Sequence, residues 1–298
     1  MVQHANLTDP VVYNLWHVIS AIDDLTPGVA DETALLGEAL CFVLTESGKP
    51  VVWKGTLKDR SGDNPDTRVR SQLGYGYIWA ALGEPEFDIF EIPEYAESGR
   101  RNMNAISVGL HTSAPRVVEN FLDMAHFPFV HTDLLGEEPH TEVAEYDVAY
   151  NPENCEIWAT NCWFYQPKAS AASDEGVMAE YKYRVPHPFC AVLYKTSPDD
   201  ETRLDAIAVF VQPLDETHVR AHLMLSVIDH QNELDKHIRL FQQTILGQDK
   251  PILENQMPRR LPLDPRAETP IRADKVSIMY RRWLRELELQ YGVIRQAA

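Results

Sequence analysis

Five strand-like segments follow one another in the middle of the chain, and this succession constrains the fold more than any other feature. Each segment is short, and its residues either are apolar throughout or alternate between apolar and polar, as in β-strands. The segments are Ile157–Tyr165, Tyr181–Val185, Ala191–Lys195, Asp205–Val211 and Val219–Leu225. Helical periodicity then begins at about residue 232 and again at about 275. Consecutive strands followed by helices predict an α+β fold with an antiparallel sheet.

The first hundred residues have the pattern of a separate, smaller β domain. Short apolar runs at 16–19, 40–44, 51–53 and 75–80 are separated by turns, and the polar stretch 54–70 is typical of a loop. A turn at residues 83–85 closes the last of these runs, and we place the boundary between about 85 and 105. We therefore expect a β domain over residues 1–100 and a larger domain over 101–298.

The charge of the chain excludes some classes of partner. The sequence has 27 Lys and Arg residues against 45 Asp and Glu residues, a formal net charge of −18. Binding to nucleic acid or to an anionic membrane needs a positive surface, so neither is expected. No apolar run approaches the roughly 20 residues that span a bilayer. The start of the chain has no signal-peptide pattern, and four cysteines are too few for a disulfide framework, so we expect a cytoplasmic protein.

The cysteines also exclude a kind of metal site. Cys41, Cys155, Cys162 and Cys190 are scattered, and none has a histidine two or three positions later or a second cysteine three positions away. The chain therefore lacks both the Cys/His pairs of a Rieske [2Fe–2S] cluster and a Cys-x-x-Cys zinc half-site.

The strongest chemical signal lies between residues 119 and 132. Asp123 and His126 are three apart, so a helix would place them on one face. Pro128 interrupts the helix before His131 and can let both imidazoles reach one point. Two imidazoles and one carboxylate form the facial triad of non-haem Fe(II) oxygenases. The alternative is a pair of hydrogen-bonded histidines at a helix end.

A candidate third ligand is Asp249, in a second helical segment. Pro251 cannot donate a hydrogen bond to the carbonyl of Gly247, so the helix is expected to be interrupted and to bend at the carboxylate. A bent helix can project one acidic side chain inward. The alternative is that Asp249 only caps residues 250–256.

These two segments resemble a known family. The run 120–131 (NFLDMAHFPFVH) is similar to the iron-binding motif of Rieske-type non-haem iron oxygenase α subunits, and 248–256 is similar to their third-ligand region. The resemblance implies a helix-grip (START-like) catalytic domain with Fe(II) held by His126, His131 and Asp249. It also implies a trimer, in which Asp123 links an iron ligand to a cluster on a neighbouring subunit.

The N-terminal part resembles the frame of that family's Rieske domain at residues 15–19, 25–28 and 75–79. Where the two Cys/His pairs should stand, only the polar stretch 54–70 is found. The chain is therefore expected to hold no [2Fe–2S] cluster of its own. Its electrons would come from a separate reductase that carries NADH, flavin and a Rieske [2Fe–2S] domain.

Within the family, an α subunit without its cluster is similar to the N-demethylases of bacterial caffeine degradation. This implies O2-dependent N-demethylation of a methylxanthine, 7-methylxanthine to xanthine and formaldehyde. The resemblance places Gln243, Leu246 and Phe121 at the substrate, and Asn120 is a weaker candidate. The alternatives are the same iron chemistry on another small N-methyl or O-methyl aromatic, or a non-catalytic helix-grip binding or assembly subunit.

Overall fold

The computed structural model describes residues 9–59, 65–168, 176–197, 200, 202–228, 234–264 and 266–295. The first sheet is antiparallel throughout, with the strand order β1-β6-β5-β4-β3-β2. Its strands are β1 (His17–Ala21), β2 (Ala30–Leu35), β3 (Glu38–Leu44), β4 (Pro50–Lys54), β5 (Arg68–Gly74) and β6 (Tyr77–Ala81). The stretch 54–70 thus holds the start of β5, and its residues 60–64 lie outside the described residues.

The second sheet is larger and also antiparallel, with the order β7-β13-β12-β11-β10-β9-β8. Its strands are β7 (Arg100–Leu110), β8 (Asp147–Asn151), β9 (Glu156–Gln166), β10 (Val177–His187), β11 (Cys190–Thr196), β12 (Leu204–Pro213) and β13 (Val219–Ile228). Each of the five predicted central strands lies within one of β9 to β13. The prediction of an α+β fold with an antiparallel sheet is confirmed.

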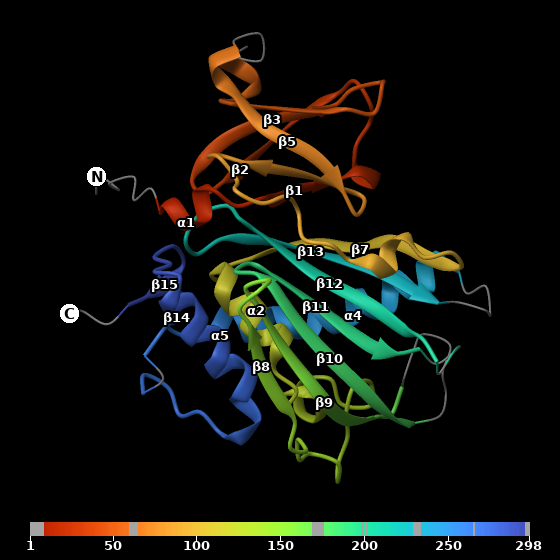
Figure 1. Ribbon diagram of the computed structural model, residues 1–298. Coiled ribbons are helices and arrows are strands. Elements are labelled where there is room, and N and C mark those ends of the chain that lie inside the picture. Colours follow the sequence, from red (N-terminus) through yellow and green to blue (C-terminus); the bar gives the residue numbers. More distant parts are fainter. Residues whose placement is uncertain are drawn as a thin grey trace.

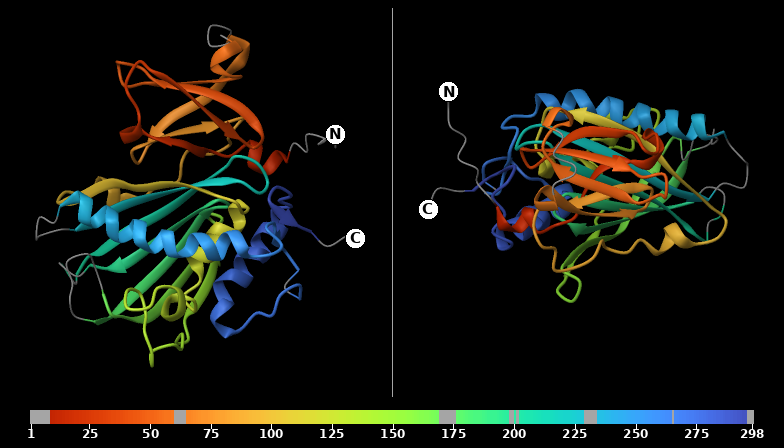
Figure 2. Two further views of the ribbon diagram at one scale, coloured as in Figure 1. Left: turned by 180° about the vertical axis from the view of Figure 1, so that it is seen from behind. Right: turned by 90° about the horizontal axis from the view of Figure 1, so that it is seen from above.

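The two faces of the second sheet bury different parts of the molecule, because side chains alternate along a strand. One face, with Val192, Ala208 and Phe210, packs against Tyr77 and Trp79 of the first sheet. The other face belongs to a core that includes residues of the helices. Figure 1 shows the first sheet above the second, and Figure 2 shows the long helix α4 (Asp235–Asn255) crossing the second sheet on its helical side.

The remaining described α-helices are shorter. They are α1 (Pro10–Tyr13), α2 (Ala114–Leu122), α3 (Phe127–Val130) and α5 (Lys275–Glu286), and the two-residue strands β14 (Leu261–Pro262) and β15 (Val293–Ile294) pair in parallel near the C-terminus. None of the helices in the described part of the chain combines the length and the apolar character that a membrane crossing requires.

Two expectations about helices were wrong. Helix α4 runs through Pro251 without a break, because proline removes only one hydrogen bond and Gly247 is exposed, where water can hydrate its carbonyl. Asp123 and His126 do not share a helix face either. Helix α2 ends at Leu122, and Asp123 has an extended backbone (φ −83°, ψ 121°). The two side chains instead meet across the turn between α2 and α3.

Candidate metal centre

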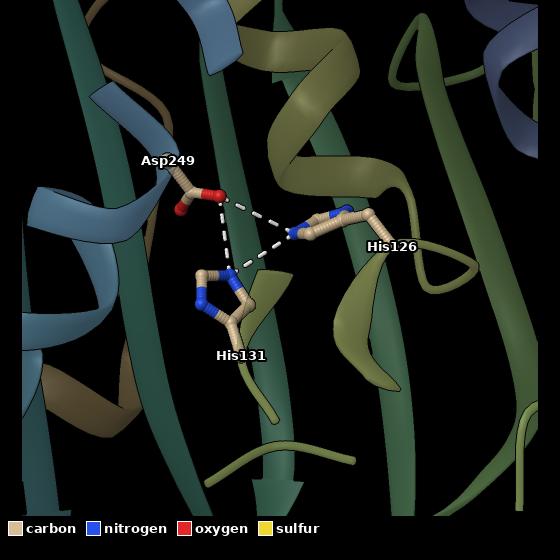
Figure 3. Close-up of side chains that lie close together, drawn as sticks. All are labelled: His126, His131 and Asp249. Atoms are coloured by element: carbon tan, nitrogen blue, oxygen red, sulfur yellow. Dashed lines mark hydrogen bonds and ion pairs between the residues drawn. The ribbon is translucent and has the colours of Figure 1, made fainter. Parts of the chain in front are cut away.

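Two helices position the three predicted ligands. His126 is the N-cap of α3 and His131 is its C-cap, so the two imidazoles stand at the two ends of a single four-residue helix. Asp249 comes from α4, more than a hundred residues later, and is buried with a relative exposure of 7%. Figure 3 shows the three side chains pointing toward one another from these separate segments. The structure thus brings together the three residues that the sequence singled out.

The distances fit a single metal ion. Asp249 Oδ1 lies 3.1 Å from His131 Nε2 and 3.4 Å from His126 Nε2. The two Nε2 atoms are 3.1 Å apart. Ligand atoms at right angles around a divalent metal, with bonds of about 2.1 Å, stand about 3 Å apart. Among the described residues, this is the one group of three His, Cys, Asp or Glu side chains whose ligand atoms converge in this way.

The hydrogen bonds on the far side of each ring also fit a metal. His126 Nδ1 lies 3.0 Å from Asp123 Oδ2, and His131 Nδ1 lies 2.8 Å from Gln248 Oε1. Each Nδ1 must donate to these acceptors, so in the neutral rings both Nε2 atoms present lone pairs. Asp249 Oδ1 is buried, and with both rings neutral it has no hydrogen-bond donor among the described residues. Three facing lone pairs repel one another unless a cation lies between them, and two imidazoles with a carboxylate are the ligands of a facial triad.

The pKa values of the site residues also favour a bound cation. Burial lowers the pKa of His126, but hydrogen bonds and charge from Asp123 and Asp249 outweigh burial and raise that pKa to about 9. Burial raises the pKa of Asp249, while the two imidazoles lower it to about 2. A positive charge between the carboxylates is therefore favoured. Without a metal, a second proton on His126 supplies that charge, and a bound cation would replace it.

The segment that carries the two histidines is held by a close backbone approach at Gly136. A Cβ atom added there would lie 2.8 Å from the nitrogen and 2.9 Å from the Cα of Pro128, and 3.0 Å from Cε1 of Phe164. Pro128 lies in α3, between the histidines, and Phe164 lies on β9. Only glycine at position 136 leaves α3 this close to the sheet.

We expect Gly136→Ala to displace α3 and to lower the free energy of unfolding by about 1–3 kcal/mol, as overpacking does. The same displacement should weaken binding of Fe(II), which is measured by titration of the metal-free protein. Gly247→Ala is the matched control, because the added Cβ meets nothing within 4 Å on α4. It should stabilise the protein by about 0.5–1 kcal/mol and leave metal affinity unchanged. Equal metal affinities in the two variants would show that Gly136 does not position the histidines.

An apolar cavity adjoins the three ligands on the helical side of the second sheet. His126, His131 and Asp249 line it, together with aromatic and aliphatic side chains. Those side chains include Phe121, Phe127, Tyr181, Tyr183, Leu193, Ile207, Val209, Leu223, Phe241 and Leu246. Flat apolar walls beside a few polar groups are typical of a site for a small aromatic ligand.

The predicted substrate contacts fall in two groups. Phe121, Leu246 and Asn120 line the cavity, and the Phe121 ring packs edge-on against Tyr183 at 6.2 Å. Gln243 does not line it. Its side chain is on the exposed side of α4 and donates to the carbonyl of Ala105 at 3.0 Å. The neighbouring Gln242 faces the cavity instead, because one residue turns a helix by about 100°.

Sequence reasoning missed several polar residues of the site. Gln248 orients His131, and Gln166 and Lys195 line the cavity from the sheet. Gln166 had a detectable signal, since it follows Cys162 and Phe164 on a strand face that is otherwise apolar.

Comparison with known proteins gives consistent matches. Residues 110–290 match the model of the vanillate O-demethylase oxygenase C-terminal domain. The chain is 45% identical to the probable methylxanthine N7-demethylase NdmC of Pseudomonas sp. (strain TJI-51), over 94% of this chain and 96% of that protein. It is 27% identical to the methylxanthine N1-demethylase NdmA of Pseudomonas putida, over 72% of this chain and 59% of that one.

Solved structures share the fold. NdmA of Pseudomonas putida CBB5 with caffeine has a TM-score of 0.72 at 21% identity, over 93% of this chain and 91% of that chain. Dicamba monooxygenase bound to 3,6-dichlorosalicylic acid has a TM-score of 0.73 at 15% identity, over 93% of this chain and 97% of that chain. At these identities the likeness extends to the fold alone.

Proposed function

Because this chain belongs to the Rieske-type non-haem iron oxygenases, we propose that it removes the N7-methyl group of a methylxanthine, with 7-methylxanthine as its substrate. The observation that carries this proposal is the convergence of His126, His131 and Asp249 on one point beside an apolar aromatic cavity. The kind of substrate comes from the relative that is 45% identical over nearly the whole length of both chains.

The metal and the cavity have different roles in the proposed reaction. A ferrous ion bound by the three side chains would supply the redox chemistry that lets O2 oxidise a C–H bond. One oxygen atom enters the N-methyl group and the other leaves as water, which consumes two electrons and two protons. The resulting N–CH2OH group breaks at the C–N bond, releasing formaldehyde and leaving N–H. The aromatic walls hold the ring flat and exclude water.

We infer that the two electrons come from another protein. Residues 1–100 form, in this proposal, a Rieske-like domain without a cluster, and Cys41 is the sole cysteine of that part of the sequence. A [2Fe–2S] cluster needs four ligands from cysteine or histidine in close pairs. A reductase with NADH, flavin and a Rieske domain would supply the electrons, while residues 101–298 carry out the oxidation.

We propose that the partner docks beside Asp123 and that electrons pass through this residue. It holds His126 by one carboxylate oxygen and accepts a hydrogen bond from the Ala125 N–H at 2.8 Å by the other. Asp123 also lines a surface depression with Glu268, Asp274 and Arg281, and His126 lines both this depression and the substrate cavity. A cluster docked there would reach the metal through one carboxylate and one imidazole. We propose a trimeric subunit arrangement that leaves this depression accessible to the partner.

The test is formaldehyde formation from a series of methylxanthines. We expect none from this chain with NADH alone or with a flavin reductase. Adding a Rieske-bearing reductase should give turnover, with one formaldehyde released per NADH oxidised and with 7-methylxanthine preferred. Turnover with a flavin reductase alone would contradict the electron source, and preference for an O-methyl aromatic such as vanillate would contradict the substrate.

A further inference from the structure

We propose that Gln166 selects substrates that keep an unmethylated amide edge, an N–H group beside a carbonyl, and that it discriminates against rings methylated there. This inference rests on the proposed function and adds a specificity-determining residue to it. The residue lies at the end of β9 and lines the cavity that adjoins the candidate metal ligands.

Gln166 is unusual because its amide is buried without a partner. Its relative exposure is 0%, and neither Nε2 nor Oε1 has a hydrogen-bond partner among the residues that the structure describes. Most buried side-chain polar atoms in proteins are hydrogen-bonded, and each one that is not destabilises the fold. An unpaired carboxamide on the wall of a substrate cavity is explained if a bound ligand completes its hydrogen bonds.

The position of Gln166 suits the far end of a ligand whose methyl group faces the metal. The centroid of the Phe127 ring lies 6.1 Å from that of the His131 ring and 5.5 Å from that of the Phe164 ring. Gln166 follows Phe164 by two residues on the same face of β9, about 7 Å further along the strand. A flat ring system extending from the metal along these aromatic side chains would therefore bring its opposite edge to the carboxamide.

The chemistry of the carboxamide defines what it can bind. Its N–H2 group donates and its oxygen accepts, side by side, which matches a ring edge that carries C=O next to N–H. Methylation of that ring nitrogen removes the donor and leaves the Gln166 oxygen buried and unpaired. Lys195, which lines the same cavity, adds positive charge that favours a carbonyl oxygen. A xanthine methylated only at N7 keeps this edge, whereas caffeine, methylated at N1, N3 and N7, has lost it.

The test is equilibrium binding of 7-methylxanthine and of caffeine to the metal-free chain, by calorimetry. In Gln166→Leu we expect the Kd for 7-methylxanthine to rise about tenfold or more, since two hydrogen bonds are lost. The Kd for caffeine should stay the same or fall. With iron and reductase supplied, KM for 7-methylxanthine should rise in the same proportion, with less effect on kcat.

Thermal stability separates this role from a structural one. Removing an unpartnered buried amide should raise the Tm of the ligand-free protein, so Gln166→Leu and the longer Gln166→Met should both melt above the native chain. The matched control is Gln72→Leu in the first sheet, where the amide donates to Asp88 at 2.6 Å. That variant should lose stability slightly and bind both xanthines normally.

Each other outcome overturns the inference. If both Gln166 variants keep the native preference for 7-methylxanthine over caffeine, Gln166 does not select for the unmethylated ring edge. The proposed function would still stand. If both variants melt lower and lose the two ligands equally, the residue is structural. If the native chain binds neither xanthine and releases no formaldehyde from either, the proposed function fails and this inference fails with it.

Discussion

Asp249→Ala is expected to yield a folded protein that retains almost no iron and forms formaldehyde more than about 100-fold more slowly than the native chain. Loss of a hydrogen-bond partner of a ligand commonly costs 10- to 100-fold in metal affinity or activity, and Asp249 is proposed as a ligand itself. The fold should survive, because His126 and His131 keep their hydrogen bonds to Asp123 and Gln248 when Asp249, their ion-pair partner, is removed. Iron per chain and formaldehyde per minute are the measurements.

The control for this variant lies on the same helix. Asp235 stands in the first turn of α4, is exposed, and pairs with Arg101 at 3.3 Å. Asp235→Ala should keep native iron content and native turnover. If Asp249→Ala holds iron as well as Asp235→Ala does, the carboxylate is not a ligand and the metal site must be sought elsewhere.

The second large effect is expected at Asp123, where the loss should fall on electron delivery. Asp123→Ala, reconstituted with excess Fe(II), should hold iron because His126, His131 and Asp249 are intact. Turnover driven by NADH and the reductase should fall about 10- to 100-fold, since the proposed link between the partner and His126 is removed. Hydrogen peroxide supplies both the oxygen and the two electrons, so product formed with peroxide should remain close to native.

Asp147→Ala serves as the comparison, because this exposed aspartate on β8 pairs only with Asn161 among the described residues. It should behave as the native chain in both assays. An equal loss of reductase-driven and peroxide-driven product in Asp123→Ala would assign Asp123 to the orientation of His126 alone. Native rates in both assays would remove it from the electron path.

The fold was predictable where one physical signal dominated. The central strands are apolar on both faces, because the second sheet is covered by the first sheet on one side and by α4 on the other. Residues such as Val192 and Leu193 therefore stand out as strand formers whichever way they point. Helix α4 was misjudged at Pro251, since a helix loses only one hydrogen bond there and packing against the sheet outweighs it.

The site was predictable to the extent that local motifs carry it. His126 and His131 are close in sequence, and Asp249 has a recognisable surrounding segment, so the three residues that converge in the candidate site were all singled out. Substrate contacts depend on the angular position of a side chain, and an error of one residue on α4 separated the exposed Gln243 from the cavity-lining Gln242. Gln166 lies on β9, and only the folded sheet places it on the wall of the cavity that adjoins His126, His131 and Asp249.

The most direct test of the central claim is to purify the chain, reconstitute it with Fe(II), and measure its content of iron and of acid-labile sulfide. We expect one iron per chain, held by His126, His131 and Asp249, and no acid-labile sulfide, because the electrons are to come from a partner. A chain that binds no stoichiometric iron would contradict the oxygenase site. Acid-labile sulfide in proportion to iron would contradict the borrowed electron supply, because it would reveal an iron–sulfur cluster within this chain.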